Sequence, residues 1–173
     1  MQRHPFILSA GLILGAAAGP ATAETLDLGI GIPRLTVAEY HRPYVAVWLE
    51  APGAAPKALS VWYDDDMKGG EGTKWLAEMR QFWRAAGRSM SFPADGVSGA
   101  TRAPGDQKIS FTPGKGSMPA LAPGAYTLVI EAAREVGGRE VVRLPFAWPP
   151  KPGAAVRDAG TTELGTVALS FKK

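Results

Sequence analysis

The chain has 173 residues, of which 19 are lysine or arginine, 16 are aspartate or glutamate and none is cysteine. Charges this nearly balanced are not typical of a nucleic-acid-binding protein, which concentrates basic side chains on one face. The lack of cysteine excludes a disulfide scaffold, a thiolate metal site and a cysteine nucleophile. We therefore expect a fold stabilised by packing and no nucleic-acid partner.

The first 23 residues differ from the rest of the chain. A charged start at Arg3 and His4 precedes an apolar run over 6–18, and small residues lead to Ala23. This order is typical of a signal peptide with an A-x-A cleavage site, and the run is shorter than the roughly 20 residues of a membrane-spanning helix. We expect cleavage near Ala23, export to the periplasm or another extracytoplasmic compartment, and a single domain over 24–173 without a transmembrane segment. A short uncleaved interfacial anchor is the alternative.

Alternating or continuous apolar residues predict β-strands along most of the mature chain. Leu26, Leu28 and Ile30 alternate with aspartate and glycine, as in a strand with one buried face. The nearly continuous apolar run over 44–49 is typical of a central strand. The same patterns predict further strands at 59–63, around 109–111, and over 126–132, 140–146 and 167–171.

One amphipathic helix is predicted over 73–86. Its apolar residues recur at helical spacing on one stripe, namely Trp75, Leu76, Met79, Phe82, Trp83 and Ala86. Gly87 follows in the position of a C-terminal glycine cap. We interpret Trp75, Phe82 and Trp83 as core residues that anchor the helix to the sheet, with a ligand platform as the alternative.

The connections support an all-β arrangement around this helix. The approach to Tyr126 looks like the tyrosine corner of immunoglobulin-like sandwiches, in which the hydroxyl binds nearby backbone. Gly137 and Gly138 predict a two-residue hairpin turn, and a Pro-rich loop is expected over 149–163. We therefore expect a mainly β fold, an antiparallel immunoglobulin-like β-sandwich with one inserted amphipathic helix. A partly open barrel is the alternative.

The irregular segment after the predicted helix runs from Asp95 to Thr101 and reads DGVSGAT. It resembles the flavinylation motif D-x-x-S-G-A-T of exported flavin-carrying proteins. In those proteins an FAD-dependent flavin transferase joins the FMN half of FAD to the last residue through a phosphoester bond and releases AMP. The resemblance implies covalent FMN on Thr101. A loop rich in glycine, serine and aspartate that spells the motif by chance is the alternative.

The residue types of this motif suit the chemistry. A hydroxyl that attacks a pyrophosphate must enter another enzyme's active site, which requires an exposed and narrow loop. Gly99 and Ala100 keep the segment narrow, while Asp95 and Ser98 can hold the turn through side-chain-to-backbone hydrogen bonds. Asp95 could instead orient the transferase's metal or the hydroxyl. Together with Thr101, these four residues are the candidate cofactor-binding residues.

The mature chain also resembles a family of predicted periplasmic proteins known as domain of unknown function 2271. The resemblance rests on the segments 42–48, 74–76, 97–102, 124–126 and 131–135. It implies an association with membrane-embedded PepSY-type reductases and flavin transferases, and hence extracytoplasmic electron transfer.

Other chemistry has little support in the sequence. His41 is the only histidine after residue 23, and no G-x-S-x-G nucleophile pattern is present. We interpret 64–66, three consecutive aspartates, as an exposed turn, with a hard-cation site as the alternative. Two functions remain. One is an FMN-bearing electron carrier that is not a stand-alone enzyme, and the other is a cofactor-free periplasmic β-sandwich module that binds a partner through its loops, with 149–163 as the candidate.

Overall fold

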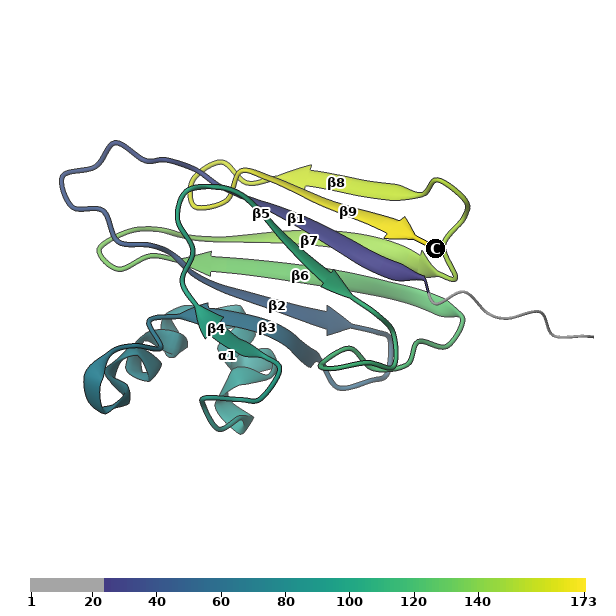
Figure 1. Cartoon of the computed structure of the whole chain (residues 1–173), viewed down its shortest axis with the longest axis horizontal. Coiled ribbons are helices and arrows are strands. Elements are labelled where there is room, and N and C mark those ends of the chain that lie inside the picture. The colour runs from purple at the N-terminus through teal and green to yellow at the C-terminus, as the bar shows by residue number, and fades with distance from the viewer. Residues whose placement is uncertain (1–23) are drawn as a thin grey trace, which may run out of the picture.

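Two β-sheets and a helical segment make up the fold (Figure 1). The computed structural model describes residues 24–173, and the predicted signal peptide at 1–23 lies outside the described residues. One sheet has four strands, in the order β5 (Gly105–Phe111), β1 (Thr25–Ile32), β9 (Thr166–Lys172) and β8 (Ala155–Ala159). The other has five, in the order β4 (Ser98–Ala100), β3 (Lys57–Tyr63), β2 (Tyr44–Glu50), β6 (Gly124–Ala133) and β7 (Arg139–Trp148). β4 runs parallel to β3, and the other neighbours are antiparallel.

The strands follow the apolar patterns of the sequence. In β1, Leu26, Leu28 and Ile30 are buried and alternate with half-buried residues. β2 is a central strand between β3 and β6. It is buried on both faces because one face packs against the other sheet and the opposite face packs against the helical segment. The predicted mainly β, sandwich-like fold is therefore confirmed, while its immunoglobulin-like connectivity stays a prediction.

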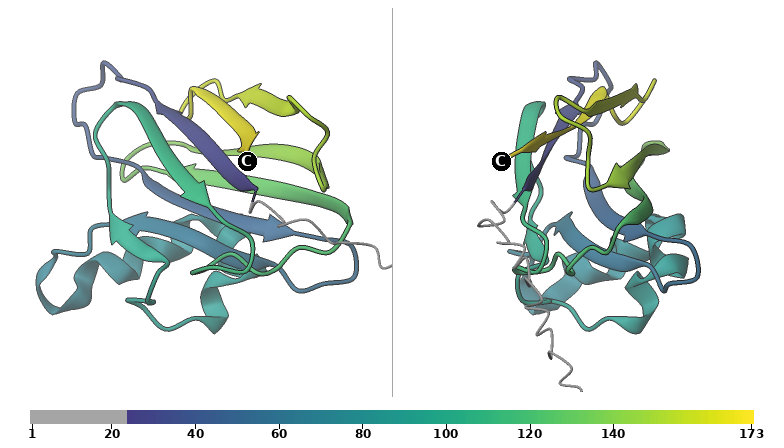
Figure 2. Two further views of the ribbon diagram at one scale, coloured as in Figure 1. Left: turned by 45° about the vertical axis from the view of Figure 1, so that its right-hand side comes forward. Right: turned by 90° about the vertical axis from the view of Figure 1, so that its right-hand side faces the viewer.

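The five-stranded sheet separates two apolar cores. One core fills the space between the sheets and includes Leu28, Ile30 and Trp62. The other lies between the five-stranded sheet and the helical segment, where the Trp48 and Phe82 rings meet with centroids 6.0 Å apart. The helical segment accordingly covers the outer face of β2 and β3, as the views in Figure 2 show.

The continuous helix predicted over 73–86 is wrong. The segment instead forms a 3-10 stretch, η1 (Lys68–Glu78), a short helix, α1 (Arg80–Ala85), and a further 3-10 turn, η2 (Gly87–Ser89). Met79 separates η1 from α1 because its ψ of 73° is not helical. The described residues contain no helix that is long and apolar enough to span a membrane.

The apolar stripe of this segment is buried except at its start and at Trp83, which is half-buried and packs against the core. Leu76, Met79 and Phe82 have no exposed surface, as predicted, but Trp75 is 44% exposed and is not a core residue. Gly87 does not end the helix as a cap. It opens η2, where a Cβ would lie only 2.8 Å from the ring of Phe82, so the absence of a side chain allows the close packing.

A carboxylate from the sheet fixes the start of α1. Glu131 on β6 is fully buried and accepts hydrogen bonds from the backbone N–H groups of Gln81 (3.1 Å) and Phe82 (2.6 Å). These are among the first N–H groups of the helix, which have no partner within it. Burial raises the pKa of Glu131, although these two hydrogen bonds act in the opposite direction. The helix therefore begins where the sheet supplies an acceptor.

The turns follow the sequence predictions only in part. The Tyr126 hydroxyl donates to the backbone oxygen of Ala122 at 2.9 Å, as predicted for a tyrosine corner. The two-residue turn at Gly137 and Gly138 is wrong, because β6 and β7 stop pairing at Ala133 and Arg139 and five residues connect them. The expected loop over 149–163 is also wrong in part, since it contains the edge strand β8.

Candidate functional site

The motif segment forms the edge of the five-stranded sheet rather than a free loop. Ser98, Gly99 and Ala100 make up β4, which pairs in parallel with residues 61–63 of β3. Two further backbone hydrogen bonds extend this pairing, from Val61 N–H to the Val97 oxygen at 2.8 Å and from Thr101 N–H to the Tyr63 oxygen at 3.1 Å. The expected loop is therefore anchored to the sheet on one side and open on the other.

A tight turn over 94–98 leads into β4. The Ser98 hydroxyl accepts a hydrogen bond from the Ala94 N–H at 2.9 Å, which is the predicted side-chain-to-backbone contact. Gly96 adopts a positive φ of 68°, which favours glycine. Asp95 is exposed at the tip of the turn, and within residues 24–173 its carboxylate makes none of the predicted hydrogen bonds to backbone. Ser98, not Asp95, therefore holds the turn.

The Thr101 side chain follows directly on β4 and is half-buried. Its hydroxyl donates a hydrogen bond to the Asp64 carboxylate, with 3.0 Å between Thr101 Oγ1 and Asp64 Oδ1. Asp64 follows β3 directly, so the parallel pairing of β3 and β4 brings the two residues together. The sequence pointed to Thr101 but not to Asp64, which belongs to the segment interpreted as an exposed turn.

The rest of that turn behaves as the sequence predicts. Asp65 and Asp66 are exposed, and Asp64 alone of the three is half-buried. Among residues 24–173, no three His, Cys, Asp or Glu side chains are placed to hold a metal ion together. The hard-cation alternative therefore has no geometric support in the described part of the chain.

Asp64 is held in place by the surrounding backbone. The Asp65 N–H donates to the Tyr63 oxygen at 2.8 Å, which turns the chain at the end of β3. Gly72 of η1 packs so closely that a Cβ there would overlap the Asp64 carbonyl oxygen. The Tyr44 hydroxyl donates to the Gly72 oxygen at 3.1 Å and ties η1 to β2, and desolvation is the main cause that raises the pKa of Tyr44 to about 12.

Arg102, the residue after Thr101, carries a positive charge. The Arg102 guanidinium stacks over the Trp62 ring at 3.9 Å from its centroid, and its Nη1 donates to the Lys108 oxygen at 3.3 Å. Such stacking over an indole is a favourable cation–π contact. Desolvation lowers the pKa of Arg102. The Thr101 hydroxyl therefore contacts the Asp64 carboxylate, while the guanidinium of the following residue is held by Trp62 and the Lys108 oxygen.

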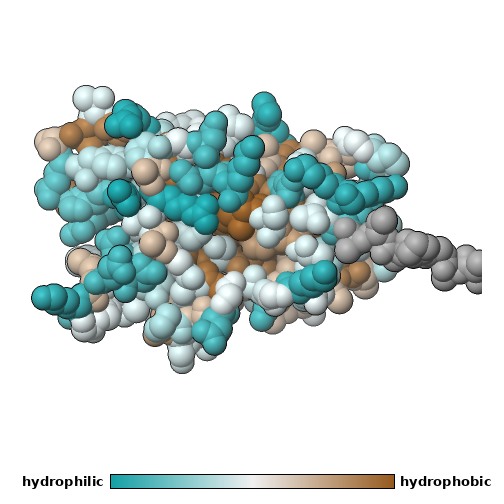
Figure 3. Space-filling view, viewed as in Figure 1, coloured by the Kyte–Doolittle hydropathy of each residue, from teal (hydrophilic) through white to brown (hydrophobic). Residues whose placement is uncertain are grey.

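The molecular surface on the side of β4 and β5 is mostly hydrophilic. β4 and β5 lie toward the viewer of Figure 1, and on this face hydrophilic side chains surround a hydrophobic area near the middle (Figure 3). Asp64 also lines a small, partly enclosed pocket that includes His41, Tyr44 and the exposed Trp75. His41 lies 3.0 Å from a Glu39 carboxylate oxygen.

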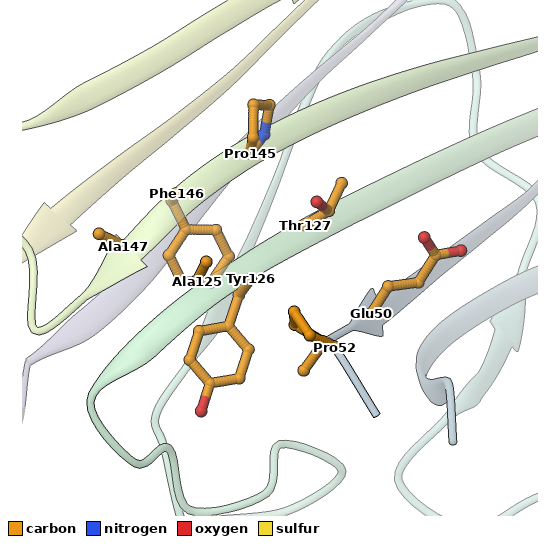
Figure 4. A pocket seen from close by; sticks show the side chains of 9 residues that line it. Glu50, Pro52, Ala125, Tyr126, Thr127, Pro145, Phe146 and Ala147 are labelled. Carbon is orange, nitrogen blue, oxygen red and sulfur yellow. The ribbon is translucent and has the colours of Figure 1, made fainter. Parts of the chain in front are cut away.

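A larger and more open groove lies at the other end of the five-stranded sheet (Figure 4). Small and apolar residues at the ends of β6 and β7 line most of it, including Ala125, Pro145 and Ala147. Glu50 at its rim is bound by Arg143 at 2.8 Å. The groove shares no residue with the surroundings of Thr101, because Glu50 ends β2 whereas Asp64 follows the antiparallel β3.

Comparison with known proteins supplies the family. No curated protein and no solved structure matches the chain. A family model described as a predicted periplasmic protein (DUF2271) matches residues 25–166, which span almost all of the described chain. The chain therefore belongs to the DUF2271 family of predicted periplasmic proteins.

Proposed function

We propose that this protein is an exported electron carrier that bears covalent FMN on Thr101. The observation that carries the proposal is the geometry of the motif. Its terminal hydroxyl is half-buried at the open edge of a sheet and already donates a hydrogen bond to the Asp64 carboxylate. A half-buried hydroxyl needs a hydrogen-bond partner in any role, and a carboxylate is the kind of partner that also activates a nucleophilic hydroxyl.

The residues around Thr101 suit the attachment of FMN. Ala100 is exposed, and a Cβ on Gly99 would meet only the Trp62 ring, at 3.9 Å, so little bulk hinders an approach to the hydroxyl. Arg102, the next residue in the chain, carries a guanidinium, a group that suits phosphate. Ser98 keeps the segment in register, and Asp95 is available for contact with a transferase. Once attached, the flavin would supply the redox chemistry, while the protein sets its exposure and electrostatics.

Two partners belong to this proposal. An FAD-dependent flavin transferase would attach the FMN, and a membrane-embedded PepSY-type reductase would exchange electrons with it. The mature chain contributes one histidine and no cysteine of its own, which favours a carrier over a stand-alone enzyme. Within the sandwich class we propose an immunoglobulin-like arrangement, supported by the tyrosine corner at Tyr126.

The second candidate function is a cofactor-free periplasmic binding module. The apolar groove of Figure 4 favours it, because open grooves lined by apolar side chains are common binding surfaces. The loop over 149–163, which we expected to carry such binding, is partly taken up by β8. The binding module would tolerate Thr101→Ala and would remain colourless after co-expression with a transferase.

The two functions are separated by co-expressing the full chain with a flavin transferase in a host that exports both. The carrier proposal expects a fluorescent band in a denaturing gel and an intact mass increased by that of FMN less one water. Thr101→Ala should abolish both signals. Thr166→Ala, which changes an exposed threonine at the start of β9, should leave both unchanged. An unmodified mass for the wild-type chain would contradict the proposal.

A further inference from the structure

The Asp64 carboxylate contacts the hydroxyl that is to be modified, although the two residues are 37 positions apart in the sequence. We propose that Asp64 is the general base for the modification of Thr101, so that the carrier supplies a catalytic group for its own flavinylation. This inference rests on the proposed function. It goes beyond the motif, because Asp64 lies outside Asp95 to Thr101 and on a different strand connection.

The backbone around Asp64 gives the carboxylate a fixed position. β3 is paired on both sides, with β2 and with β4, and the pairing with β4 sets the place of its end relative to Thr101. The close packing of Gly72 against the Asp64 carbonyl fixes the residue from the side of η1. Groups that act in catalysis must be held close to their productive geometry, and residues at the ends of rigid strands satisfy this condition better than residues in long loops.

The hydrogen bond also has the direction that a general base requires. Thr101 Oγ1 donates, so its proton points toward Asp64 and its lone pairs point away from Asp64. A base must lie within roughly 2.6 to 3.2 Å of the atom whose proton it takes, and the observed separation is 3.0 Å. Among residues 24–173, no lysine, arginine or histidine forms an ion pair with Asp64. The Thr101 hydroxyl is thus the side-chain partner that the Asp64 carboxylate has among the described residues.

The other acidic residues nearby do not meet these conditions. Asp95 is the acid of the motif itself, but it is exposed at the tip of the preceding turn. Asp65 and Asp66 are exposed, and among the described residues neither carboxylate accepts a hydrogen bond from a hydroxyl. Of the acids in these two segments, Asp64 alone has the geometry of a base for Thr101.

The proposed step conserves atoms, charge and oxidation state. Thr101 Oγ1 attacks the FMN-side phosphorus of FAD, which the transferase brings to the site, and forms a new O–P bond. The P–O bond to the AMP half breaks, and AMP leaves with the bridging oxygen and its electron pair. The hydroxyl proton passes to Asp64 and from there to solvent. Nothing is oxidised or reduced.

Steady-state kinetics of FMN attachment test the proposal. Purified full-length protein, without bound flavin, is titrated against a flavin transferase with FAD in excess, and flavin attached to the chain is measured against time. Asp64→Asn keeps a hydrogen-bond acceptor but removes the base. Because general bases contribute about 10²- to 10⁴-fold, kcat should fall by at least about 10²-fold while KM stays within about twofold. Asp66→Asn, an exposed neighbour, is the matched control and should behave as wild type.

Each result decides a separate question. A wild-type chain that accepts no FMN contradicts the proposed function. A labelled wild type with an equally fast Asp64→Asn variant overturns only the role of Asp64, and so does a variant with raised KM and unchanged kcat, since that pattern indicates docking. If Asp64→Asn fails to fold, Asp64→Glu decides, because a retained carboxylate should keep kcat within about tenfold of wild type. A loss as complete as that of Thr101→Ala would then overturn the proposal.

Discussion

The carboxylate of Glu140 on β7 joins the two sheets, and its replacement gives a quantitative test of the fold. Its oxygens accept hydrogen bonds from the backbone N–H groups of Thr161, Thr162, Glu163 and Leu164, at 2.5 to 3.1 Å. These donors belong to the connection between β8 and β9 of the four-stranded sheet. We expect Glu140→Gln to destabilise the protein, because an amide presents its NH₂ group to donors that need an acceptor.

The size of the effect follows from the pKa of Glu140. Desolvation raises this pKa, but the hydrogen bonds from the 161–164 backbone and the Thr161 hydroxyl outweigh it and bring the pKa from 4.5 down to about 2. One unit corresponds to about 1.4 kcal/mol, so the shift amounts to roughly 3 kcal/mol. Because the side chain is partly exposed, we reduce this to about 2 kcal/mol for screening by solvent. The pKa is lowered on folding, so this stability is present above pH 4.5 and is lost as the pH falls toward 2.

Urea unfolding of the wild type and of Glu140→Gln between pH 7 and pH 2 measures this directly. The variant should unfold with a free energy about 2 kcal/mol lower at pH 7, and the difference should shrink as the pH falls below about 4.5. A difference under 0.5 kcal/mol at pH 7 would refute the reasoning. So would a difference that stays constant down to pH 2, because the loss would then not come from the charged carboxylate.

Two further substitutions test the fold and the site. Arg134→Ala leaves the Glu163 carboxylate, 4% exposed, without its cation, and should cost about 3 to 5 kcal/mol in urea unfolding; Lys74→Ala, which breaks an exposed pair, should cost less than about 1 kcal/mol. Gly72→Ala forces a Cβ against the Asp64 carbonyl oxygen and should cost about 1 to 3 kcal/mol. It should also slow FMN attachment, whereas an unchanged rate would show that the position of Asp64 does not matter.

The sequence predicted strands wherever burial follows a simple period. β1 alternates because one face meets the core, and β2 is apolar throughout because both faces are covered. β8 was missed because four of its five residues are exposed, so no apolar pattern exists to detect. The strand forms because it pairs with β9. The local sequence of β8 does not reveal this pairing.

The helix and the hairpin turn failed for related reasons. The stripe of Leu76, Met79 and Phe82 is buried as predicted, but the backbone breaks at Met79, where Glu131 of β6 sets the start of α1. Gly137 resembles a turn glycine, yet a Cβ there would collide with the Arg134 guanidinium. The Arg134 side chain is held there by its ion pair with Glu163. In both places a buried carboxylate that is distant in the sequence decides the conformation, and local propensity does not reveal it.

The same limit applies to the candidate site, and it has a chemical consequence. A motif identifies Thr101 because its residues are contiguous, whereas Asp64 reaches the hydroxyl only through the pairing of β3 with β4. In the proposed reaction the hydroxyl loses the proton that it donates to Asp64, and a negatively charged phosphate takes that proton's place. Like charges at this distance repel. In the proposed reaction Asp64 therefore first promotes the attachment of FMN and then repels the phosphate that has been attached. This repulsion directs the attached group away from Asp64.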